Sequence, residues 1–265
     1  MGGCSGVFFQ PYRAHVRTPA QLNLPYEDVY FQAHDGTALH GWFLPAQGNA
    51  IGTILFLHGN AENISTHIGS VYWLPAKGFN VFLLDYRGYG VSEGTPSLAG
   101  VQDDVDSALK ILLARKDVQA DRVVVFGQSL GGAIAIYYVA HSRYRAHIRA
   151  LVTESAFASY HQIAREKLAA FWLSWPLQYP LSWTVSDAYS PSAAVSQVSP
   201  IPYLIIHGDQ DSIVPLHHGQ RLYALAQEPK QLWVVKNGAH IQAFKQQTYR
   251  DRFVAYLTKI LSVSP

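Results

Sequence analysis

The sequence predicts one α/β domain with a mostly parallel central sheet and helices on both faces. Three observations support this fold class. Short apolar runs such as 53–57 and 122–126 alternate with longer helix-like segments such as 98–114. Nearly continuous apolar strands are typical of parallel sheets that are buried on both sides. The 265 residues, of which 49% are hydrophobic, are enough to form one sizeable core.

The predicted elements follow one another regularly after a lead of residues 1–25. Strand-like runs at 27–32 and 39–44 flank the turn signal Asp35-Gly36 and predict an opening antiparallel hairpin. Further strands are expected at 53–57, 79–84, 122–126, 150–153, 203–206 and 231–235, and helices at 64–76, 98–114 and 130–140. A last helix has the buried stripe Tyr249, Phe253, Tyr256, Leu257 and Ile260. We therefore expect residues 26–265 to form a single domain.

An insertion at about 157–200 interrupts this order between two core strands. It contains Pro176 and Pro180 among aromatic residues, and we expect it to form a small helical cap. The candidates for substrate contact are Phe171, Trp172, Trp175 and Trp183. Packing within the cap is an equally good interpretation of these side chains, and the two roles are compatible.

The extreme N-terminus has two interpretations. Gly3-Cys4 followed by small residues resembles the end of a bacterial lipobox, in which the cysteine becomes lipidated. On that interpretation Met1 is an added residue or the natural start lies upstream, and Cys4 attaches the protein to a membrane of the cell envelope. The alternative is an ordinary cytoplasmic N-terminus. The myristoylation pattern fails, because Gly6 stands where a hydroxyl residue is needed.

Composition excludes several classes of protein and cofactor. Lys and Arg number 20 against 18 Asp and Glu, so no strong field exists to hold nucleic acid. The single cysteine, Cys4, rules out an intrachain disulfide and a cysteine-rich zinc site. No apolar run reaches the roughly 18 residues of a spanning helix. The Gly-x-Gly-x-x-Gly fingerprint is missing, so no nicotinamide or flavin cofactor is expected.

The histidines do not suggest a metal site. There are 12 of them, but none belongs to a His-Glu-x-x-His motif or a Cys/His cluster. His217 and His218 are adjacent, and on a helix their side chains are expected to diverge. We therefore expect no metal.

Ser129 is the candidate nucleophile. Gly127-Gln128-Ser129-Leu130-Gly131 follows a predicted strand and begins a predicted helix, as a nucleophile elbow requires. The tight turn strains the serine backbone, and glycines supply space where chain segments approach. A serine that merely caps the helix after a glycine turn is the structural alternative.

A serine hydroxyl needs a base and a carboxylate that orients this base. His240 follows one predicted strand, within Asn237-Gly238-Ala239-His240, and is the candidate base. Asp211 follows the preceding strand and is the favoured acid, whereas Asp209, two positions earlier, is assigned a turn-capping role. The chain order Ser, acid, His is the one expected when a nucleophile elbow follows a strand.

The oxyanion donors are expected to be the backbone N–H groups of Asn60 and Leu130. Asn60 lies in the loop His58-Gly59-Asn60 after a buried strand, and Leu130 starts the helix behind Ser129. A glycine turn with a capping Asn is compatible with this role.

With these motifs in order, the sequence resembles the α/β-hydrolases of the serine hydrolase superfamily. The match runs from about residue 26 to the C-terminus, and includes Asp85-Tyr86-Arg87-Gly88-Tyr89-Gly90 besides the motifs above. It is similar to a branch with many membrane-associated members, among them protein depalmitoylases and bacterial hydrolases. The resemblance implies a Ser-Asp-His mechanism without a cofactor, but no particular substrate.

The expected reaction is hydrolysis of a carboxylic ester through an acyl-enzyme. The aromatic cap favours small-molecule esters with apolar acyl or aryl groups. A thioesterase or depalmitoylase and a serine peptidase with the same triad remain alternatives. A non-catalytic scaffold is disfavoured by the intact Ser129, Asp211 and His240. The sequence leaves the oligomeric state open.

Overall fold

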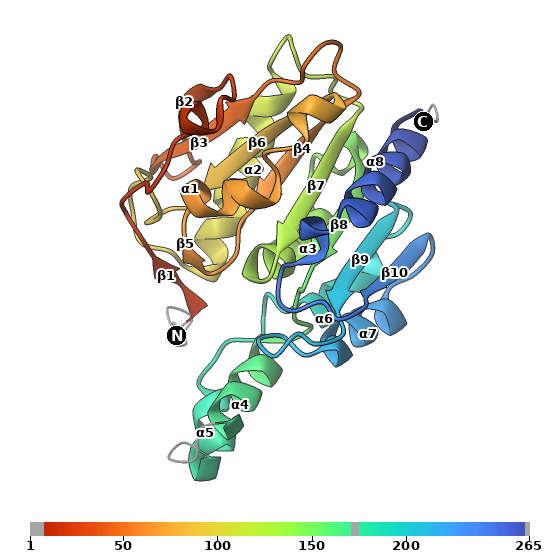
Figure 1. Cartoon of the computed structure of the whole chain (residues 1–265). Coiled ribbons are helices and arrows are strands. Elements are labelled where there is room, and N and C mark those ends of the chain that lie inside the picture. The colour runs from red at the N-terminus through yellow and green to blue at the C-terminus, as the bar shows by residue number, and fades with distance from the viewer. Residues whose placement is uncertain (1–7, 171–174, 263–265) are drawn as a thin grey trace.

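The computed structural model describes residues 8–170 and 175–262 (Figure 1). Its eight-stranded sheet has the order β10-β9-β8-β7-β4-β6-β3-β2. The strands are β2 (Glu27–Gln32), β3 (Ala38–Leu44), β4 (Gly52–Leu57), β6 (Phe79–Asp85), β7 (Val123–Gln128), β8 (Ile148–Glu154), β9 (Tyr203–Gly208) and β10 (Lys230–Val235). Only β2–β3 and β3–β6 pair antiparallel. The predicted parallel sheet with an antiparallel opening hairpin is therefore confirmed.

Helices cover both faces of this sheet. The helices of the described residues are α1 (Ile64–His67), α2 (Leu98–Leu113), α3 (Leu130–His141), α4 (Tyr160–Ala170), α5 (Gln178–Trp183), α6 (Pro191–Ala194), α7 (Leu216–Leu225) and α8 (Gln247–Ser262). Of these, α4 and α5 project from one end of the sheet and cover neither face. Within β4, Leu55 and Leu57 pack in one core cluster with residues of α2, α3 and α7. Ile54 and Phe56 point to the other cluster, which contains α1 and the apolar stripe of α8. The two-residue alternation of strand side chains thus fills two cores.

The helix predicted over 64–76 is much shorter in the structure. α1 ends at His67, and separate short 3-10 turns follow at Ile68–Ser70 and Pro75–Lys77. Pro75 lacks the N–H that an α-helix would need at that position, so the prediction of one continuous helix was wrong. No sequence signal had indicated α7.

The insertion forms the predicted helical cap. In Figure 1, α4 and α5 project together from one end of the sheet. Phe171 and Trp172 lie outside the described residues, and nothing is described of the Trp175 side chain.

The N-terminal lead packs against the domain instead of standing apart from it. β1 (Gln10–Pro11) pairs in parallel with β5 (Ala61–Glu62). Phe9 is buried in the core cluster of α2 and α3. Cys4 lies outside the described residues. Of the helices in the described ranges, none has the length and apolar character required to span a membrane.

Candidate active site

Ser129 stands where β7 turns abruptly into α3. Its backbone has φ 51° and ψ −117°, a conformation that is strained for a residue with a side chain. The turn is held because the N–H of Ser129 donates to the carbonyl of Glu154 at 2.9 Å. The carbonyl of Ser129 accepts the N–H of Ala133 at 3.1 Å.

The glycine that follows the serine by two positions is sterically required. A Cβ atom at Gly131 would collide with the backbone carbonyl oxygens of Leu57 and His58 at the end of β4. Helix α3 can therefore begin close against the sheet only with glycine at this position, as the sequence indicated.

The predicted acid and base lie together beyond the ends of β9 and β10. Asp211 Oδ2 lies 2.8 Å from His240 Nδ1. Asp211 Oδ1 accepts the backbone N–H groups of Ile213 at 2.9 Å and Val214 at 2.8 Å. Asp209 is exposed, and its N–H donates to the carbonyl of Val235. The geometry thus pairs His240 with Asp211.

The Asp211 carboxyl stays ionised in its buried position. Burial acts to raise its pKa, but the hydrogen bond with His240 and the backbone N–H of Val214 outweigh burial and lower it below the ordinary value. A carboxylate at this place accepts the Nδ1 proton of His240 and leaves Nε2 able to accept a proton.

Glu154 was not predicted from the sequence, and it joins the serine turn to the histidine loop. Its Oε2 accepts from Gln128 Nε2 at 2.6 Å and its Oε1 accepts the N–H of Ala243 at 2.8 Å. Burial raises the pKa of this carboxyl above its usual range, although the bonds from Ala243 and Gln128 oppose the shift. Because its backbone carbonyl also accepts the N–H of Ser129, Glu154 connects the serine turn with the histidine loop.

The Ser129 side chain reaches a pocket and is partly exposed. In the part of the chain that the structure describes, its hydroxyl forms no hydrogen bond. In unliganded enzymes the contact between nucleophile and base is often long and tightens when substrate binds.

Asn60 and Leu130 line the pocket beside Ser129. As the first residue of α3, Leu130 has an N–H with no partner inside the helix. The side-chain Oδ1 of Asn60 accepts the N–H of Gln10 at 2.9 Å, and its carbonyl accepts the Tyr89 hydroxyl at 2.7 Å. These contacts fix the loop that presents the backbone of Asn60.

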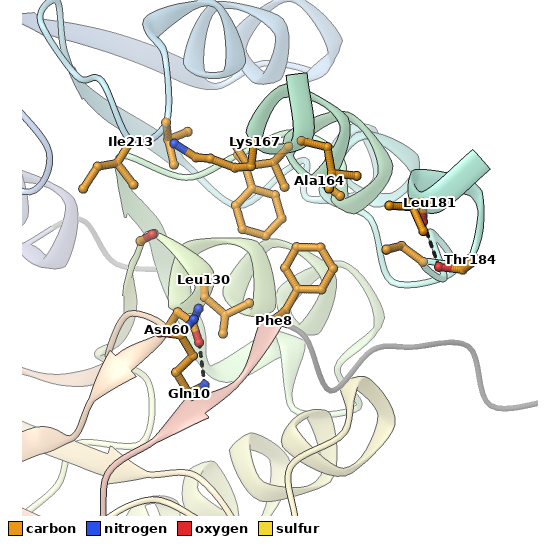
Figure 2. A pocket seen from close by; sticks show the side chains of 15 residues that line it. Phe8, Gln10, Asn60, Leu130, Ala164, Lys167, Leu181, Thr184 and Ile213 are labelled. Atoms are coloured by element: carbon orange, nitrogen blue, oxygen red, sulfur yellow. Dashed lines mark hydrogen bonds between the residues drawn. The ribbon is translucent and has the colours of Figure 1, made fainter. Parts of the chain in front are cut away.

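The pocket has a volume of about 690 Å³ and a mostly apolar wall (Figure 2). Phe8 and Gln10 come from the N-terminal lead, and the cap helices supply side chains such as Ala164 and Leu181. Lys167 is the one charged residue among the described residues of the lining. Trp183 is 72% exposed and does not belong to the lining.

The cap is tied to the core through Glu166 of α4. Its two carboxylate oxygens lie 3.0 Å from His217 Nε2 and 3.0 Å from His218 Nε2 of α7. The prediction that the two histidines diverge was wrong, because their rings stack with centroids 4.5 Å apart. His218 Nδ1 accepts the N–H of Ala158, so its Nε2 donates to Glu166.

A mostly parallel sheet with a serine on a strained turn after a central strand defines an α/β-hydrolase. The model of one protein family, described as serine aminopeptidase S33, matches residues 48–197. The chain belongs to this family of hydrolases.

Proteins from distant organisms are similar to this chain in sequence or in fold. YfhR of Escherichia coli K12 is 42% identical over 243 residues, which cover 89% of this chain and 82% of YfhR. The α/β hydrolase domain-containing protein WAV2 of Arabidopsis thaliana is 38% identical over 223 residues, which cover 81% of this chain and 71% of WAV2. The structure of an esterase from Pyrococcus furiosus superposes with a TM-score of 0.76 at 22% identity, covering 96% of this chain and 97% of the esterase. The prediction of an α/β-hydrolase fold is confirmed.

Proposed function

We propose that this protein is a serine esterase that cleaves carboxylic esters through an acyl-enzyme. One observation carries the proposal. The hydrogen-bonded pair Asp211–His240 lies at the same edge of the sheet as Ser129, which a strained turn presents to a pocket. This is the set of groups that nucleophilic acyl transfer requires.

Each residue has a defined part in the reaction. Ser129 Oγ attacks the ester carbonyl carbon while its proton passes to His240 Nε2. The carbonyl oxygen becomes an oxyanion, which the N–H groups of Asn60 and Leu130 stabilise. His240 then gives the proton to the departing alkoxide. Water attacks the acyl-enzyme with His240 as base, and the proton returns to Ser129 Oγ as the acid leaves.

The pocket favours apolar acyl or aryl groups. Its lining includes apolar side chains that cannot form hydrogen bonds with a polar substrate, namely Phe8, Phe157, Ile163, Leu181 and Val214. The volume of about 690 Å³ lies within the range of sites that enclose small molecules. The exposed Trp183 gives no support to a direct role of that ring in binding.

A serine peptidase is the second candidate, because the family model is described as an aminopeptidase. An aminopeptidase needs an anionic group for the free α-amine of its substrate. Among the described lining residues the charged one is Lys167, which is cationic. This charge favours the esterase. A thioesterase that acts on lipidated proteins would use the same pocket and triad.

The deciding experiment is hydrolysis of a p-nitrophenyl ester series from acetate to palmitate, with Ser129→Ala as control. We expect turnover that depends on Ser129 and peaks at an intermediate acyl length. A fluorophosphonate probe should label the wild type at Ser129 and leave the variant unlabelled. Turnover of aminoacyl anilides alone would favour the peptidase, thioesters alone the thioesterase, and an unlabelled folded protein the non-catalytic scaffold.

Membrane attachment through a lipid on Cys4 is a separate proposal. It is tested by the intact mass of the native protein, where an unmodified Cys4 would end it.

A further inference from the structure

Three histidines that are distant in the sequence surround the buried carboxyl of Asp85. His15 Nε2 of the N-terminal lead lies 2.8 Å from Asp85 Oδ2. His40 Nδ1 of β3 lies 3.8 Å from the same oxygen, and His58 Nε2 lies 3.8 Å from Asp85 Oδ1. The exposed fractions of the side chains are 16% for His15, 1% for His40 and 0% for His58 and Asp85.

The other ring nitrogens of two of these histidines are already engaged. His40 Nε2 lies 2.8 Å from Asp28 Oδ1, so this nitrogen carries the proton. His58 Nδ1 donates in the same way to the carbonyl of Gly59 at 2.7 Å. In the neutral rings, His40 Nδ1 and His58 Nε2 therefore point lone pairs at the Asp85 carboxylate.

Neither of these two nitrogens has a hydrogen-bond partner among the described residues, although both are buried. The Asp85 carboxylate accepts hydrogen bonds from His15 Nε2 and from the N–H of Ile64, but neither bond gives the two histidine nitrogens a partner. Their lone pairs repel the carboxylate that they face, and burial makes such an arrangement costly. A cation between the groups removes the repulsion. The Asp28 carboxylate behind His40 is also the usual outer support of a metal-binding imidazole.

We propose that His15, His40 and Asp85 form a binding site for a divalent transition-metal cation of the zinc type. Their three ligand atoms lie within 4.8 Å of one another. Tetrahedral zinc with bonds near 2.0–2.1 Å separates its ligand atoms by roughly 3.3 Å. The distances of 2.8 Å from His15 and 3.8 Å from His40 to Asp85 Oδ2 lie on either side of this value. Small side-chain shifts would bring the three atoms to a common ion.

Gly90 lets the backbone pass closely beside the proposed ligands. A Cβ atom at this position would overlap Asp85 Oδ2 and would lie 2.6 Å from His15 Nε2. The backbone is fixed there because the N–H of Gly90 donates to the carbonyl of Tyr12 at 3.0 Å. The partial exposure of His15 gives an ion access to the cluster.

A second group of possible metal ligands, Glu166, His217 and His218, is a weaker candidate for a metal site. His218 uses both ring nitrogens, one to accept from Ala158 and one to donate to Glu166. A metal at either cluster would replace a hydrogen bond, that of His218 with Glu166 or that of His15 with Asp85. The Asp85 cluster differs in that one of its proposed ligand atoms, His40 Nδ1, is buried without a partner among the described residues.

Metal binding would connect the lead to the pocket. His15 belongs to the same segment as Phe8 and Gln10, which line the pocket. The N–H of Gln10 also binds Asn60 Oδ1. An ion held by His15 would therefore fix one wall of the pocket against the sheet. This consequence is independent of the reaction that the pocket performs.

The alternative to a metal ion is a proton on His40 Nδ1, which would then donate to Asp85.

The experiment uses protein without a histidine tag, which is freed of metal with a chelator and titrated with Co²⁺, then with Zn²⁺. We expect one Co²⁺ per chain with the visible absorption of a tetrahedral ion, displaced by one Zn²⁺. Zinc at 100 times its Kd should raise the Tm by roughly 5 to 10 °C.

The matched variants are His15→Gln and His40→Gln, with His34→Gln as control. His34 is also paired with an aspartate, Asp106, but lies outside the cluster. We expect the cluster variants to lose more than about 100-fold in zinc affinity and the control to bind as the wild type. Circular dichroism establishes that the variants fold. If they do not fold, the cobalt spectrum of the wild type still decides. No cobalt spectrum in the wild type, or equal zinc binding by folded cluster variants, would overturn the proposal in favour of the proton.

Discussion

Replacing Asp211 with Asn tests the assignment of the triad acid most sharply, because the structure fixes how the new side chain must point. Asp211 Oδ1 accepts two backbone N–H groups, from Ile213 and Val214. The Asn oxygen must take this place, which turns its NH₂ group toward His240 Nδ1. Since an NH₂ group only donates, His240 would have to accept at Nδ1 and carry its proton at Nε2.

A proton on Nε2 blocks the nitrogen that should receive the Ser129 proton. The best-studied triad loses about 10⁴-fold in kcat after the same change, which corresponds to about 5.5 kcal/mol of activation free energy. Because both backbone N–H groups keep their acceptor, we expect the Tm of Asp211→Asn to stay within about 3 °C of the wild type.

The assay is kcat for the best p-nitrophenyl ester, with Asp209→Asn as the matched control. Asp209 is exposed, so its variant should retain most of the wild-type activity. The reasoning is refuted if folded Asp211→Asn stays within tenfold of the wild type, or if Asp209→Asn loses more activity than Asp211→Asn does.

Three further predictions concern the pocket, the turn and the cap. Ala164→Trp should reduce turnover of long-chain esters about tenfold or more relative to acetate, whereas Trp183→Ala, outside the pocket lining, should leave this ratio unchanged. Gly131→Ala should lower the Tm by about 10 °C in thermal unfolding, whereas Gly69→Ala, which meets no atom within 4 Å, should not lower it. Burial lowers the pKa of His218, so the folded protein favours the neutral ring. The stability that this neutral ring contributes is present above pH 6.5 and is lost as the pH falls below that value. When the pH is lowered from 7.5 to 5, the free energy of unfolding should fall by up to about 2 kcal/mol more in the wild type than in His218→Gln. An equal fall in both proteins would contradict the assignment of this effect to His218.

The sequence was sufficient for the features that depend on local pattern. The strands were found because each is a short run of apolar residues, and the serine turn because Gly131 must stand beside the end of β4. The pair of Asp211 and His240 was found because parallel strands bring their carboxyl ends to one edge.

Features that depend on contacts between distant segments were missed. Glu154 binds the N–H of Ala243, and no local pattern relates these two positions. His15 and His40 meet Asp85 only after the lead folds over the sheet. Helix α7 is only ten residues long and contains Gly219 and two adjacent histidines, which weaken the local signal for a helix.

The part that the N-terminal segment plays in the pocket wall affects how the protein can be shortened or tagged. A version that begins at residue 26, where the sequence suggested the domain starts, would lose the buried Phe9 and the pocket residues Phe8 and Gln10. The exposed core surface would invite aggregation, and the substrate site would open to water on that side. We therefore expect the smallest functional unit to include the lead, and a fusion partner to be tolerated better at the opposite terminus.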